Sequence, residues 1–187
     1  MRIISGNLKG KKILQPKDRL TRPLKDLTKE SIFNIIKHSN LINIDLESSN
    51  ILDLFSGVGS FGLECLSRGA LMVTFVENYK EVLLVLKKNI ENLKLENYSK
   101  IIEKNVFDVS TLKLLNNKFE IIFIDPPYKE KELSNLLDNI IQLKLLKDNG
   151  TIILHRHKKE KDIFPVNFNI ILEKNYGVSK IIFGYTI

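Results

Sequence analysis

The chain has 187 residues, 43% of them hydrophobic, and its 29 basic and 22 acidic residues give a formal net charge of +7. This length and composition predict one globular domain, or one domain with a small appendage, and exclude a disordered chain. The positive charge favours a polyanionic partner such as nucleic acid, although a solvated basic surface explains it equally well. No apolar run approaches the roughly 20 residues of a membrane span, and the first residues lack the apolar core of a signal peptide.

Cysteine usage bears on the compartment. Cys65 is the only cysteine, which excludes an intramolecular disulfide and offers no zinc-binding pattern. A reduced compartment fits this composition, so we expect a cytoplasmic protein that has no contact with a membrane.

The amino-terminal segment is short, basic and punctuated by glycine. Residues 3–4 and 13–14 predict the two strands of a hairpin, with Gly6 and Gly10 in or near its turn. Residues 24–38 follow with a helical pattern. That pattern places on one helix face the apolar side chains of Leu24, Leu27, Ile32, Ile35 and Ile36.

From residue 50 onward, strand patterns alternate with helical patterns. Strands are predicted at 51–55, 72–77, 100–104, 120–125 and 150–155, and helices at 60–68, 80–95, 110–115 and 132–146. The strands are continuous apolar runs, which indicates that both faces of the sheet are buried. The alternation predicts an α/β fold with a doubly wound parallel sheet. Residues 168–177 and 178–187 predict a terminal antiparallel hairpin, because no helix separates them.

A glycine-rich loop follows the first strand of this alternating region. The sequence Asp53-Leu-Phe-Ser-Gly57-Val-Gly59-Ser-Phe-Gly62 satisfies G-x-G-x-x-G, with a strand before it and a helix after it. Glycines let the backbone pass close to a ligand and open a helix tightly. The pattern alone leaves open a dinucleotide, S-adenosylmethionine (SAM) or a plain tight turn.

Polar residues at the strand ends bear on the choice of ligand. A carboxylate at Asp53 suits the ammonium group of SAM and repels a pyrophosphate. Glu77 closes the second strand, where an acid can bind the ribose hydroxyls of either ligand or can simply be solvated. After the third strand, Asn105 or Asp108 could accept from an adenine amine, or could cap the next helix.

The fourth strand ends in Asp125-Pro126-Pro127-Tyr128, beside the glycine loop in a doubly wound sheet. The prolines remove two backbone donors and fix two φ angles, so nearby carbonyls are acceptors held in set directions. Tyr128 offers a flat face on which a base can stack. Elsewhere such a tetrapeptide is more often a turn, but here it predicts a site for a nucleobase amine.

An exocyclic amine is a poor nucleophile because its lone pair is delocalised into the ring. Acceptors for both of its N–H groups favour a more pyramidal nitrogen, whose lone pair can point at a methyl group. A carboxylate also stabilises the positive charge that develops on nitrogen and can take its proton. A sulfonium is already electrophilic, so we expect no metal.

These motifs resemble those of class I SAM-dependent methyltransferases that modify exocyclic amino groups. The segments MRIISG…KGKKI, RP…D…KESIFNII, ILDLFSGVGSFGLECLSRGA, FVE, FIDPPY and the late YG occur in the order seen in bacterial RsmD-type enzymes. Those enzymes are small-subunit (16S) ribosomal RNA guanine-N2 methyltransferases. The resemblance covers nearly the whole chain, and the amino-terminal segments make the narrower family case.

The resemblance implies a Rossmann-like, seven-stranded, mostly parallel sheet that ends in an antiparallel hairpin. It implies an RNA-binding extension over residues 1–40 and a methyltransferase domain over residues 41–187. The target guanine is expected at Asp125, Pro126, Pro127 and Tyr128. The residues expected to bind SAM are Asp53, Phe55, Ser56, Gly57, Gly59, Glu77, Asn78, Asn105 and Val106. Phosphate contacts are expected from Arg2, Lys9, Lys11, Lys12 and Arg22.

The chain departs from the family pattern at three positions. The family usually has threonine after RP and arginine after the aspartate, where this chain has Leu24 and Leu27. An acid commonly ends the fifth strand, where this chain has His155. The sequence from His155 to His157 could suggest a metal pair, but no third ligand is evident, and we interpret both histidines as solvated strand-end residues.

We therefore predict methyl transfer from SAM to the exocyclic N2 amine of a guanine in 16S ribosomal RNA, free or in an assembling 30S subunit, by a monomer. Adenine-N6 methylation of RNA or DNA is the alternative, because the same turn serves that chemistry. A nicotinamide-dependent oxidoreductase would leave Asp53 and the proline turn unexplained. A non-catalytic RNA-binding module is suggested by charge alone.

Overall fold

The computed structural model describes residues 1–16, 24–127 and 130–187. Its strands are β1 (Asn50–Leu54), β2 (Met72–Val76), β3 (Ser99–Ile102), β4 (Phe119–Ile124), β5 (Leu146–His157), β6 (Phe168–Tyr176) and β7 (Ser179–Thr186). Its α-helices are α1 (Asp26–His38), α2 (Ser60–Ser67), α3 (Lys80–Leu93), α4 (Val109–Leu112) and α5 (Leu133–Gln142). Two 3-10 turns are η1 (Leu46–Ser48) and η2 (Glu96–Tyr98). Within these ranges, no helix is long and apolar enough to cross a membrane.

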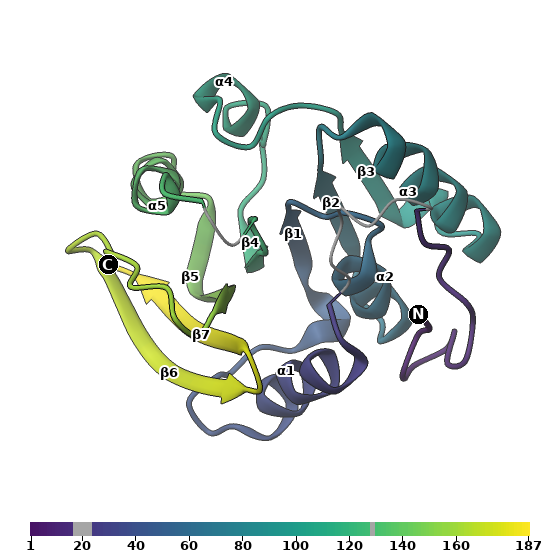
Figure 1. Ribbon diagram of the computed structural model, residues 1–187, viewed down its shortest axis with the longest axis horizontal. Coiled ribbons are helices and arrows are strands. Elements are labelled where there is room, and N and C mark those ends of the chain that lie inside the picture. The colour runs from purple at the N-terminus through teal and green to yellow at the C-terminus, as the bar shows by residue number, and fades with distance from the viewer. Residues whose placement is uncertain (17–23, 128–129) are drawn as a thin grey trace.

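The strands form one sheet in the order β3-β2-β1-β4-β5-β7-β6 (Figure 1). β1 to β5 are mutually parallel, whereas β7 is antiparallel to both β5 and β6. The predicted α/β class, the mostly parallel sheet and the terminal antiparallel hairpin are therefore confirmed. The chain order reverses between β1 and β4, so a ligand crevice is expected outside the carboxyl ends of these two strands.

Helices cover both faces of the sheet, which explains why the strands are continuously apolar (Figure 1). On the face of α1, α2 and α3, the rings of Phe33, Phe61 and Phe123 stack in a row, with successive centroids 5.3 and 4.0 Å apart. On the face of α4 and α5, Leu112 and Leu137 belong to a second buried cluster. The two clusters hold the sheet between the helices, and the site residues lie at the carboxyl ends of its strands.

The amino-terminal hairpin is more irregular than predicted. A single antiparallel bridge joins Arg2 to Lys12, in place of two regular strands. The Ile3 amide donates to the Lys11 carbonyl at 2.9 Å, and the Gly10 amide donates to the Ile3 carbonyl at 2.9 Å. The predicted hairpin path is present, but the prediction of two strands is wrong in this detail.

Helix α1 lies where the sequence predicts it, but one assignment to its buried face is wrong. Leu27 is 70% exposed. It lies nine residues before the buried Ile36, about 2.5 helical turns, and therefore on the opposite side of the helix. Lys29 and Phe33 share the buried face with Ile36 instead.

The helices α2, α3, α4 and α5 all end one to four residues before their predicted ends. α3 ends at Leu93 and α5 at Gln142, where the sequence predicted residues 95 and 146. Lys94 and Lys144 adopt left-handed backbone conformations just after these helices, with φ of 58° and 51°. Glycine usually occupies such a position, so a lysine there does not indicate the end of a helix.

Candidate active site

The glycine loop joins β1 to α2 through three residues with positive φ. Phe55, Gly57 and Gly59 have φ angles of 59°, 56° and 84°. A Cβ atom at Gly59 would lie 2.6 Å from the Leu86 Cδ1 atom, so this glycine allows close packing against α3. A Cβ atom at Gly57 would meet nothing within 4 Å, so the loop faces open space there. Gly57 can therefore let a ligand approach the backbone.

Asp53 is a buried carboxylate beneath this loop. It is 1% exposed, and its Oδ2 atom accepts a hydrogen bond from the Gly62 amide at 3.0 Å. Burial raises the pKa of Asp53 well above its usual value, the Gly62 amide opposes this rise, and the negative charges of Asp125 and Glu77 add to it. A cation bound beside these three carboxylates would reduce the repulsion among them and would favour the ionised form of Asp53.

Glu77 connects the end of β2 to the glycine loop. Its Oε2 atom accepts from the Gly57 amide at 2.9 Å, and its Oε1 atom accepts from the amides of Asn78 and Tyr79 at 2.9 and 3.0 Å. The side chain is half-buried and engaged, in contrast to a freely solvated strand-end acid. Because a carboxylate offers about four lone-pair sites, Glu77 retains acceptor capacity for a ligand hydroxyl.

The loop after β3 has two polar side chains with local roles. The Oδ1 atom of the exposed Asn105 accepts from the Phe107 amide at 3.1 Å, and Val106 is buried. Asp108 caps α4, because its side chain accepts from the Ser110 amide, so the capping interpretation holds for Asp108. No sequence pattern indicated Phe107, whose ring centroid lies 5.3 Å from that of Phe55, between the loop after β3 and the glycine loop.

The proline turn begins directly after β4. The side chain of Asp125 is 21% exposed, and the backbone amide of Asp125 lies 3.4 Å from the Leu54 carbonyl of β1. Pro126 is buried and Pro127 is exposed. Tyr128, the predicted stacking residue, lies outside the described residues. The β1 and β4 ends thus bring Asp125 close enough to Asp53 for its negative charge to raise the pKa of Asp53.

Strand β5 supports this turn through His155, which the sequence analysis interpreted wrongly. His155 is 6% exposed rather than solvated. Its Nδ1 atom lies 2.9 Å from Asp125 Oδ1, and its Nε2 atom lies 2.9 Å from Ser179 Oγ. The register explains the contact, because Leu154 of β5 pairs with Ile124 of β4 and the next residues along both chains are neighbours.

Arg156 is a second residue that the sequence analysis missed. It is 1% exposed, and its guanidinium donates to the carbonyls of Pro127 and Glu130 at 3.4 and 3.1 Å. Its Nε atom donates to Asp162 Oδ1 at 2.9 Å. An arginine inside an apolar strand indicates a buried charge that needs partners, and this sequence feature could have revealed Arg156. Arg156 therefore holds the chain that leaves the proline turn.

The amino-terminal hairpin is fixed to α2 and α3 by buried polar side chains. Glu64 accepts from the amides of Ile4 and Ser5 at 2.8 and 2.9 Å. Asn89 accepts from the Leu14 amide at 2.8 Å and donates to the carbonyls of Leu14 and Val58. The exposed basic residues expected to bind phosphate are thereby presented on a rigid support, and they are Arg2, Lys9, Lys11 and Lys12. Arg22 lies outside the described residues.

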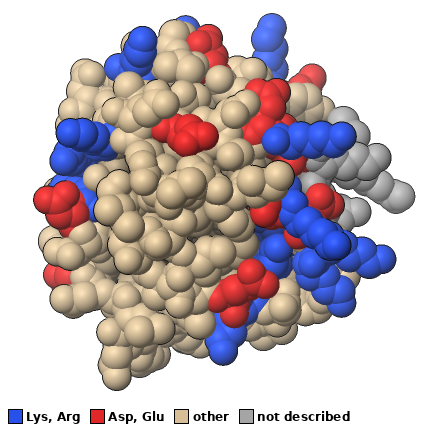
Figure 2. All heavy atoms as spheres, turned by 90° about the vertical axis from the view of Figure 1, so that its left-hand side faces the viewer, with Lys and Arg blue, Asp and Glu red and all other residues tan. Residues whose placement is uncertain are grey.

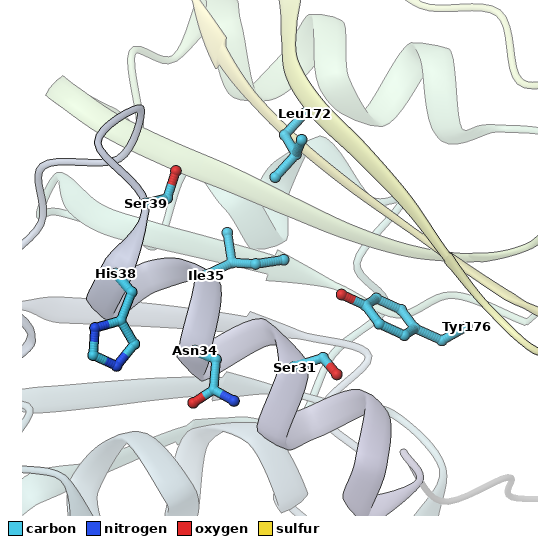
Figure 3. Close-up of a pocket in the computed structure, with 7 residues that line it drawn as sticks. All are labelled: Ser31, Asn34, Ile35, His38, Ser39, Leu172 and Tyr176. Carbon is cyan, nitrogen blue, oxygen red and sulfur yellow. The ribbon is translucent and has the colours of Figure 1, made fainter.

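A separate concave surface lies between α1 and β6, away from these residues (Figure 3). Ile35 projects from α1 towards Leu172 and Tyr176 of β6 (Figure 3). None of the predicted site residues lines it. The residues predicted to be catalytic or to bind the cofactor instead lie at or just after the carboxyl ends of β1, β2, β3 and β4.

Comparison with known proteins identifies close relatives. A family model described as Conserved hypothetical protein 95 matches residues 1–185. The chain is 38% identical over 176 residues to the ribosomal RNA small subunit methyltransferase D of Buchnera aphidicola subsp. Acyrthosiphon pisum, covering 92% of this chain and 86% of that protein. It is 34% identical over 184 residues to the Escherichia coli K12 protein of that name, covering 95% and 85%. A presumed methylase from Haemophilus influenzae superposes with a TM-score of 0.77 at 30% identity, covering 100% and 98%.

Proposed function

Because the chain belongs to the Conserved hypothetical protein 95 family, we propose that it transfers a methyl group from SAM to the exocyclic N2 amine of a guanine in small-subunit ribosomal RNA. The family agrees with the predicted resemblance to RsmD-type enzymes. One observation carries this proposal. Asp125 and its proline turn lie beside the glycine loop, at the edge where Asp53 and Glu77 meet. The hydrogen-bond acceptors of the proline turn, which suit the target amine, thus lie next to Asp53 and Glu77, which suit the cationic SAM.

The residues of the crevice fit SAM. Its ammonium and sulfonium charges would offset the repulsion among the buried and half-buried carboxylates near Asp53. Glu77 would accept from the ribose, and Phe55 and Phe107 would flank the adenine. Bound SAM would supply a methyl group on a sulfonium that is already electrophilic. The remaining residues proposed to line its site are Ser56, Gly57, Gly59, Asn78, Asn105 and Val106.

Asp125 is the proposed catalytic residue. Its carboxylate accepts one N–H of the target amine, which makes the nitrogen lone pair available and stabilises the positive charge that develops there. The same carboxylate can take the proton that leaves nitrogen after transfer. Pro126 and Pro127 contribute no N–H donor, so the turn presents acceptors to the amine.

The activity can be tested with tritiated SAM and two substrates, naked 16S RNA and small ribosomal subunits from a strain that lacks the enzyme. We expect label in one guanine, recovered as N2-methylguanosine after nuclease mapping. Recovery of N6-methyladenosine would contradict the guanine assignment. Failure to transfer label to either substrate would contradict the methyltransferase proposal itself.

The amino-terminal residues 1–40 are proposed to hold the RNA. Their basic side chains lie on a hairpin fixed to α2, the helix that follows the glycine loop. By contrast, the face that carries α5 and the carboxy-terminal hairpin is largely uncharged at its centre, with basic and acidic side chains interspersed around its rim (Figure 2). The described residues at the centre of that face therefore offer no basic surface to a polyanion (Figure 2).

Replacing Lys9, Lys11 and Lys12 together with serine should weaken RNA binding by roughly tenfold or more at 0.1 M salt, because each lost phosphate contact removes counterion release. The slope of log affinity against log salt should fall by up to about 3. Filter binding at several salt concentrations measures both quantities. Serine at Lys113, Lys118 and Lys144, which are also exposed, removes the same charge and is the control. An unchanged slope in the first variant would remove the hairpin from the RNA interface.

A further inference from the structure

The carboxylate of Asp125 needs a partner from outside its own turn. An aspartate at the start of a turn commonly accepts from the amide two residues later. Here that residue is Pro127, which has no N–H group, and Pro126 has none either. The two prolines that present acceptors to a substrate therefore also deprive Asp125 of its usual local support.

His155 provides that support from the neighbouring strand. Its Nδ1 atom lies 2.9 Å from Asp125 Oδ1, and its side chain is 8% exposed. An ionised carboxylate can only accept, so Nδ1 carries the proton and donates it whether the imidazole is neutral or charged. The contact therefore fixes one carboxylate oxygen and the plane of the group, and leaves Oδ2 for the substrate.

Ser179 fixes the other end of the imidazole. Its Oγ atom lies 2.9 Å from His155 Nε2 in a buried contact between β7 and β5. In the antiparallel register, Ser179 pairs with His157, so its side chain lies on the same sheet face as that of His155. With both nitrogens engaged, the ring has little freedom to rotate.

We propose that His155, oriented by Ser179, is a positioning residue that holds Asp125 Oδ1 so that Oδ2 faces the amine to be methylated. This inference rests on the proposed function. It assigns a role to the position where the family commonly has an acid. A histidine there supplies a donor to Asp125, whereas an acid would place a second negative charge beside it.

Four variants test the role through kcat, the KM for RNA and the dissociation constant for SAM. His155→Ala should lower kcat by about 10–100-fold, as removal of a hydrogen-bond partner that orients a metal ligand does, with SAM affinity little changed. His155→Asn can place an amide N–H where Nδ1 stands, and should recover most of the loss. His155→Gln reaches towards Ser179 instead and should recover little. Ser179→Ala should give a smaller loss of kcat.

His157→Asn is the matched control on the same strand, two residues further along, and should keep the wild-type kcat. Equal activity of the asparagine and glutamine variants of His155 would overturn the inference, because it would show that the side chain only fills space. So would a wild-type kcat in a folded His155→Ala protein. Absence of transfer by the wild-type protein would instead contradict the proposed function.

A second measurement needs no turnover. In ¹⁵N-labelled wild-type protein, the His155 ring should show a slowly exchanging proton on Nδ1, which should be lost in Asp125→Ala. A proton found only on Nε2, or one that Asp125→Ala leaves unchanged, would overturn the inference even if the substrate of the enzyme were different.

Discussion

Replacement of Asp125 with asparagine is expected to lower kcat for methyl transfer by roughly 10²–10⁴-fold, the range typical of a lost proton acceptor. Asparagine keeps an oxygen that can accept from His155, so the side chain should stay in place. It cannot take a proton and carries no charge to stabilise a cationic nitrogen. The variant therefore separates the chemistry of Asp125 from its position.

The measurement is single-turnover transfer of tritiated methyl groups, together with a calorimetric titration of SAM. SAM should still bind, because Asp53 and Glu77 are unchanged and the Asp125→Asn change removes only one of the three neighbouring negative charges. Asp148→Asn is the matched control, since Asp148 is exposed near the opposite end of the sheet in β5. Retained turnover in Asp125→Asn would contradict the proposed role, and loss of SAM binding would move Asp125 into the cofactor site.

The parts of the site that the sequence predicts share one property. Asp53, Glu77 and Asp125 each lie at the carboxyl end of a predicted parallel strand. In a doubly wound sheet these ends meet at one edge, so a linear pattern is enough to place the residues together. The fold class is predictable for the same reason, because strand–helix alternation leaves few arrangements open.

The parts that were missed depend on contacts between segments far apart in the chain. His155 meets Asp125 only through the register of β5 on β4, and Ser179 joins them only because β7 is antiparallel to β5. Neither register can be read from apolar runs, which look alike when shifted by one residue. Polar residues in a buried strand, such as Arg156, were the available clue, since burial requires a partner.

The same limit applies to Lys29 of α1, because its partner lies on another helix and a helical pattern does not reveal it. Its side chain is fully buried, and its Nζ atom lies 3.5 Å from Glu64 Oε2 and 3.0 Å from the Arg2 carbonyl. Burial lowers the pKa of Lys29, and the negative charge of Glu64 opposes this shift. Glu64 also accepts from Arg68 and from two hairpin amides, so one carboxylate joins α1, α2 and the hairpin.

Replacing Glu64 with glutamine should therefore destabilise the protein by about 3–5 kcal/mol, the typical result of leaving one charge of a buried pair unpaired. Glutamine also turns amide donors towards groups that are themselves donors. Urea denaturation measures the free energy of unfolding. Glu91→Gln on the exposed side of α3 is the control and should change it by less than about 0.5 kcal/mol.

A double variant separates the unpaired charge from the lost hydrogen bonds. Adding Lys29→Met to Glu64→Gln removes the buried cation, so the pair should be less destabilising than the sum of the single changes by about 0.5–3 kcal/mol. In Glu64→Gln alone, the folded-state pKa of Lys29 should fall further below its value in the unfolded chain. The unfolded chain then binds more protons between those two pKa values, and stability should rise with pH across that alkaline interval. Two results together would show that Lys29 carries no uncompensated charge. The free-energy changes of the two single variants would add up to that of the double variant, and the destabilisation of Glu64→Gln would not decrease at alkaline pH. The lost stability would then be due to the hydrogen bonds that hold the hairpin.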